Sequence, residues 1–133
     1  MPTIEEAIAT FGVTVDPHLD RQADIPILSG LQFQGDVAVV PAERTPSRTP
    51  VPADGVAVVR GEAGTNTHLL LATGTVCYTP DVFGTVLGVL TVAEGATAYL
   101  AHPEHAFSGI GPGTYELRRQ REQGDRETRL VAD

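Results

Sequence analysis

The sequence predicts an all-β fold: a small antiparallel barrel or sandwich of about 7–9 short strands, with a short helix and an arm before it. Short runs rich in valine, leucine, threonine and tyrosine recur along residues 33–131, and these residue types favour half-buried strands. The 14 glycines and 10 prolines separate most of these runs, as turns do. The same glycine content argues against a mainly helical body, because glycine weakens helices.

Residues 1–31 are predicted to form an N-terminal helix and an extended arm. Thr3 and Glu6 fit a capping box, and Gly12 suits the end of a helix. Between these signals, apolar side chains share one helical face: Ile4, Ala7, Ile8 and Phe11. Fewer than three turns do not persist in isolation, so we expect this helix to dock on the rest of the protein. The arm, Val13–Leu31, contains two prolines and is expected to hold at most short extended pieces.

Residues 32–133 are predicted to form a single all-β domain. The expected strands are Phe33, Asp36–Val40, Val56–Arg60, His68–Ala72, Thr75–Tyr78, Val86–Val92, Thr97–Ala101, Tyr115–Arg121 and Thr128–Val131. The runs at 37–40 and 56–59 do not alternate, which indicates that both faces are covered or that the sheet folds on itself. The glycine-rich stretch 108–113 leads into a strand rather than a helix, so we interpret it as a turn and not as a phosphate loop.

Residues 41–54 interrupt the strand pattern. This segment holds four prolines as well as Arg44 and Arg48, and no strand core accommodates so many prolines. We therefore expect a long exposed loop of partly polyproline character. Such a loop is either a plain connection or a surface that recognises a partner.

Charge and composition oppose several classes of function. A formal net charge of −8 repels phosphate backbones and anionic membrane surfaces, so we expect neither nucleic-acid nor membrane partners. The acidic N-terminus does not look like a secretory signal, and no apolar run approaches the roughly 20 residues of a spanning helix. A cytoplasmic or virion location is therefore expected. A single cysteine excludes a disulfide framework within the chain.

The C-terminal end is the only locally basic part of the sequence. Residues 118–133 carry five arginines against four carboxylates, whereas residues 1–117 carry four against thirteen. Arg118, Arg119 and Arg121 are the candidate partner-binding residues, because arginine pairs with carboxylates of a neighbouring subunit or with an anionic ligand. The competing interpretation is a solvated strand or tail whose arginines pair within the chain.

Three of the four histidines stand in predicted turns beside strands. His102 and His105 belong to a His-Pro-Glu-His turn with Glu104, while His68 begins a strand and Glu62 precedes it. Imidazole and carboxylate are ligands for a divalent metal such as Zn, Fe or Mn, and neighbouring strands can direct alternate residues toward one ion. These five residues are the candidate metal ligands. The competing interpretation is a structural histidine cluster bonded to loop carbonyls.

The order of these motifs resembles that in a family of small uncharacterised bacterial and phage-associated all-β proteins. The resemblance rests on Gly-Asp-Val at 35–37, Gly-Glu at 61–62, the turn at 102–105, Pro-Gly-Thr-Tyr at 112–115 and Arg-Gln-Arg-Glu at 119–122. It spans about residues 32–133. Where the family has Gly-His-x-His, this chain has Thr65-Asn66-Thr67-His68, and asparagine is a poor ligand for transition metals. The resemblance implies a fold and no reaction.

Two functions are compatible with these observations. The favoured one is a non-enzymatic accessory or assembly module, such as a phage capsid or tail decoration protein, that contacts a protein partner or forms a homo-oligomer. The alternative is a cupin-like metal enzyme. In it, His68, His102 and His105 hold a divalent ion, Glu62 or Glu104 completes the shell, and an open position binds substrate.

Overall fold

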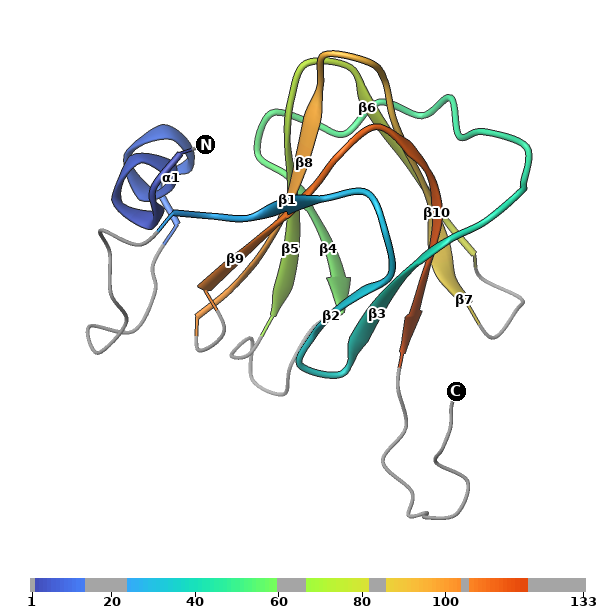
Figure 1. The fold of residues 1–133 in the computed structure, drawn as a ribbon, viewed down its shortest axis with the longest axis horizontal. Helices are drawn as coiled ribbons and strands as arrows, with labels where there is room; N and C mark the ends of the chain where they lie inside the picture. The colour runs from blue at the N-terminus through green and yellow to red at the C-terminus, as the bar shows by residue number, and fades with distance from the viewer. Residues whose placement is uncertain (1, 14–23, 60–66, 82–85, 104–105, 120–133) are drawn as a thin grey trace.

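The computed structural model describes residues 2–13, 24–59, 67–81, 86–103 and 106–119, which form one helix and two facing five-stranded sheets (Figure 1). Helix α1 spans Ile4–Phe11. The strands are β1 Ile27–Leu28, β2 Gln32–Gln34, β3 Val37–Pro41, β4 Val56–Val59, β5 His68–Thr73, β6 Val76–Pro80, β7 Val86–Val92, β8 Thr97–His102, β9 Ala106–Ile110 and β10 Gly113–Arg119. The all-β prediction is confirmed, and the architecture is the sandwich rather than the barrel.

The strand order shows which edges of the two sheets lie on the same side of the sandwich. The first sheet has the strand order β1-β9-β8-β5-β4, and the second has β2-β3-β10-β7-β6. Neighbouring strands run antiparallel except β1 and β9, which are parallel. The consecutive strands β1 and β2 therefore lie at corresponding edges of the two sheets, and β4 and β6 lie at the opposite edges. The predicted strand at 128–131 lies outside the described residues.

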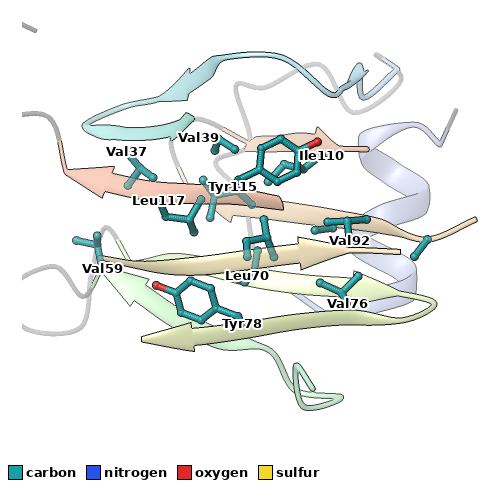
Figure 2. Close-up of a cluster of buried hydrophobic side chains, with 14 residues drawn as sticks. Val37, Val39, Val59, Leu70, Val76, Tyr78, Val92, Ile110, Tyr115 and Leu117 are labelled. Carbon is teal, nitrogen blue, oxygen red and sulfur yellow. The ribbon is translucent and has the colours of Figure 1, made fainter. Parts of the chain in front are cut away.

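The main core fills the space between the sheets. Strand side chains alternate between the two faces of a sheet, so every second residue points inward. Figure 2 shows this cluster, with Leu70 of the first sheet and Tyr115 and Leu117 of the second among its fully buried members. Each such side chain stabilises the fold by about 1.5–3 kcal/mol relative to an exposed one.

Helix α1 covers the outer face of the first sheet (Figure 1). The predicted capping box is present: Thr3 Oγ1 accepts from the Glu6 amide at 3.1 Å, and Glu6 Oε1 accepts from the Thr3 amide at 2.8 Å. Gly12 ends the helix with a positive φ of 71°. The predicted docking is confirmed by a second buried cluster, which comprises Ile4, Ala7, Ile25, Leu71, Tyr99, Ala101 and Phe107. Helix α1 has eight residues. Among the described residues, no helix is long and apolar enough to cross a membrane.

The proline-rich segment 41–54 crosses the outer face of the second sheet. Only Pro41, the last residue of β3, belongs to a regular strand, and most residues of the segment are exposed, as predicted. Ser47 is its buried anchor: its amide donates to Thr91 Oγ1 at 2.9 Å, and its hydroxyl lies 2.6 Å from that of Thr79. These hydroxyl contacts tie the segment to strands β7 and β6.

Beyond Ser47 the same segment runs beside the edge strand β6. The Val51 amide donates to the Val76 carbonyl at 3.0 Å, and the Tyr78 amide donates to the Thr49 carbonyl at 2.8 Å. A short bridge joins Pro50 to Cys77. Because prolines offer no N–H to a further strand, the segment protects this edge of the sheet.

The glycine-rich stretch 108–113 differs from the prediction, because its first half is strand β9 rather than turn. Gly109 pairs with Ile27 of β1, and a Cβ placed there would lie 2.7 Å from the Pro26 carbonyl oxygen. A glycine in this strand thus allows β1 to approach closely. The turn itself comprises Gly111 and Pro112.

Tyr115 holds that turn, where the chain passes from the first sheet to the second. Its hydroxyl lies 2.7 Å from the Gly111 carbonyl oxygen and 3.1 Å from that of Pro112. The residue is 1% exposed, and burial raises the pKa of its phenol despite a hydrogen bond to Ser29. The tyrosine therefore combines a core ring with a polar tie between the sheets.

We expect Tyr115→Phe to lower the free energy of unfolding by about 1–2 kcal/mol, because the buried Gly111 carbonyl loses its hydrogen-bond donor while the ring stays in place. Urea denaturation followed by circular dichroism measures this difference. A loss below about 0.3 kcal/mol would show that the hydroxyl does not stabilise the crossing.

Candidate functional site

His68 and His102 lie side by side on the first sheet. The antiparallel register of β5 and β8 pairs Leu69 with Ala101, which places the two histidines opposite each other at the next position. Their ring centroids are 4.5 Å apart and their planes are inclined by 44°. The structure thus brings together two predicted ligands that are 34 positions apart in sequence.

This histidine pair lies at the end of the main core. His68 alternates with Leu70 and His102 with Leu100, so the imidazoles lie on the inner side of the sheet. They are 3% and 4% exposed. The neutral imidazole is the form that binds metals.

The other candidate ligands, Glu62, Glu104 and His105, lie outside the described residues. Within the part of the chain that the structure describes, no three histidine, cysteine or carboxylate side chains gather closely enough to hold a metal ion. The described pair therefore comprises two of the candidate ligands, whereas catalytic zinc usually takes three from the protein.

The predicted partner-binding arginines that the structure describes are exposed on β10 but paired within the chain. Arg118 bonds to Glu116 through Nε at 2.9 Å and Nη2 at 2.5 Å, while Arg119 Nε bonds to Asp36 at 3.1 Å. Arg44, from the proline-rich segment, reaches the other carboxylate oxygen of Glu116 at 3.0 Å. The competing interpretation, internally paired arginines, thus describes both Arg118 and Arg119. Arg121 lies outside the described residues.

The Glu116 carboxylate is the centre of this ion-pair group. Its side chain is 13% exposed, and burial by itself would raise the pKa of the carboxyl. Hydrogen bonds from Arg44 and Arg118 outweigh burial and hold the pKa below its usual value. The group fastens the proline-rich segment to the outer face of the second sheet.

The sequence analysis did not identify a group of exposed apolar residues at the β1 and β2 edges of the two sheets. Leu28, Leu31 and Phe33 are the large apolar residues most exposed in the described ranges, at 47%, 58% and 53%. They lie on β1, on the link that follows it and on β2. We call these three residues the edge strip.

Two inward glutamines fix the outward direction of Phe33. Gln34 Nε2 donates to the Leu100 carbonyl at 2.8 Å, and Gln32 Nε2 donates to the Gly109 carbonyl at 3.1 Å. Both glutamines are buried and attach β2 to the opposite sheet. Because alternate residues face opposite ways, Phe33 between them is directed to solvent.

A sequence signal for the edge strip exists. Residues 25–35 form a run of eleven positions without a charged side chain, in a chain in which 20% of residues are charged. The run stands between Asp24 and Asp36. Its apolar content, more than its length, distinguishes it from an ordinary solvated arm, because the predicted strands include longer uncharged runs, such as residues 63–80.

We expect Arg44→Ala to raise the pKa of Glu116 and to destabilise the protein by about 0.5–1 kcal/mol at pH 7. Since the folded-state pKa is lowered, the carboxylate's contribution is complete above the unfolded value of about 4.3 and is lost as pH falls through the folded value. A carbon-13 NMR titration of Glu116 measures the shift. Arg48→Ala, an exposed arginine of the same segment, is the matched control, and an equal shift in both variants would contradict the assignment.

Comparison with known proteins places the chain in a family. No curated protein and no solved structure matches it. A family described as a domain of unknown function, DUF8820, matches residues 33–120. This range begins within β2 and includes Phe33, the histidine pair and β10. Because the match covers well over half of the sequence, the chain belongs to the DUF8820 family of domains of unknown function.

Proposed function

We propose that the protein is a non-enzymatic accessory or assembly module that acts through protein–protein contacts. The observation that carries this proposal is the edge strip. Single exposed apolar residues are ordinary on protein surfaces, but three large ones within residues 28–33, on β1, on β2 and on the link between them, favour an interaction site.

The free energy that the edge strip can contribute to binding is enough for part of an interface but not for a whole one. Its three side chains are each about half exposed, so burying the remainder would contribute about 2–4 kcal/mol in total. Only the upper end of that range reaches the binding energy of a complex with a millimolar Kd, which is about 4 kcal/mol. A stable assembly therefore needs further contacts, and the backbone groups of an edge strand can provide them.

The remaining surface agrees with a protein partner. The net charge of −8 disfavours nucleic acid and anionic membranes, and the exposed arginines of β10 are already paired. A decoration protein of a phage capsid or tail, or an accessory subunit in the cytoplasm, is the particular form that we propose.

The test is the size of the protein's assembly in extracts of cells that naturally make it. We expect the wild type to elute above the 14.0 kDa of one chain, and Leu31→Glu to elute as the monomer, because a carboxylate in the edge strip must be desolvated on contact. Thr75→Glu, an exposed position in the turn before β6, is the control and should behave as the wild type. Elution of the wild type as a monomer would refute the assembly function.

A second candidate function, a cupin-like metal enzyme, is favoured by the contact between His68 and His102. Zn–N bonds of about 2.1 Å put two nitrogens on one tetrahedral ion about 3.4 Å apart. Imidazoles with centroids 4.5 Å apart are compatible with that spacing. We propose His105, Glu104 or Glu62 as the third ligand, with Zn, Fe or Mn as the metal and an open position for substrate.

Metal analysis of protein purified without an affinity tag tests this candidate. If it is correct, one equivalent of divalent metal is present, chelator lowers the melting temperature, and His102→Gln weakens zinc binding at least tenfold. His18→Gln should leave zinc binding unchanged. Metal-free protein whose melting temperature is the same with and without chelator would remove the enzyme hypothesis and leave a structural histidine pair.

A further inference from the structure

We infer that the edge strip docks a second copy of this chain, so that the protein forms a two-fold homodimer across strand β2. The inference rests on the proposed assembly function and names its partner. Three observations support it: the open edge of β2, the absence of charge along residues 25–35, and the rigid presentation of Phe33.

The first observation is the contrast between the two edges of the second sheet. At one edge, residues 49–51 run beside β6 and bond to it. At the other edge, β2 pairs with β3 through Phe33 and Ala38, and no further strand lies beside β2 in the described part of the chain. Proteins protect an open edge with charge, with proline or by keeping the edge strand short. Strand β2 carries neither charge nor proline, and its three residues restrict a partner strand to few backbone bonds, so the exposed side chains must supply most of the contact.

The second observation concerns the partner's charge. Two copies of a chain with net charge −8 repel each other at long range, and charged side chains at the contact would add to that repulsion. A two-fold contact places the same patch on both sides, so the exposed uncharged residues 28–31 and Phe33 of one copy would meet those of the other. The nearby Asp36 carboxylate is bonded to Arg119 at 3.1 Å, which reduces the charge beside β2. A strongly basic partner would instead select an acidic edge.

The third observation is that little of the contact surface must be ordered on binding. The inward glutamines hold β2 against the first sheet, and Phe33 points outward between them. Preorganised groups bind with a smaller loss of conformational entropy. Antiparallel pairing of β2 with its copy, centred on Phe33, would bring the two aromatic rings together and join the sheets edge to edge.

Sedimentation equilibrium of the purified full chain tests the inference. Across a concentration series we expect the mass to rise from 14.0 kDa toward twice that value. Phe33→Glu should weaken dimerisation at least tenfold, because two buried carboxylates would face each other. Thr75→Glu adds the same charge at the opposite edge and should dimerise as the wild type.

Two further measurements keep the outcome interpretable. Circular dichroism and thermal unfolding confirm that Phe33→Glu is folded, as its 53% exposure leads us to expect, and Leu31→Glu repeats the test outside the strand. A monomeric wild type at all concentrations overturns the inference. If extracts then still contain a larger assembly that Leu31→Glu dissolves, the partner is a different protein and the assembly function survives. If extracts contain the monomer, both proposals fail.

Discussion

Burial of alternating side chains between two facing sheets is the constraint on which the other features depend. In a strand that follows this alternation, moving the register by one residue would exchange its inner and outer faces. The register that buries Leu70, Leu100 and Leu117 also places His68 and His102 inside and Phe33 outside. The histidine pair and the exposed edge strip are therefore consequences of one packing arrangement. Tyr115 supports it by tying the crossing between the sheets.

The outer surfaces of the two sheets are completed by segments without strand structure of their own. Helix α1 covers the first sheet with apolar side chains, whereas the proline-rich segment crosses the second with hydroxyl contacts and the Glu116 ion pairs. That segment also protects the β6 edge. The β2 edge has no such cover among the described residues.

Much of the fold could be predicted from local signals. The capping box at Thr3, the strand at 86–92 and the interruption at 41–54 each carry their own residue pattern, and the structure has all three. Strand β9 was not predicted, because its Gly109 is explained by the approach of β1, a contact far away in sequence. The contact of His68 with His102 could be proposed but not located, since register depends on the whole sheet. The edge strip was missed for the same reason: exposure is a property of the assembled edge.

The central claim is that the register between β5 and β8 places His68 and His102 next to each other on the inner face of the first sheet. Nuclear Overhauser contacts between the ring protons of His68 and His102 test it most directly, because the centroids are 4.5 Å apart. We predict strong contacts between the two rings, with Leu69 opposite Ala101 across the strands. Absence of the ring contact, together with a cross-strand pattern displaced by one residue, would contradict the account.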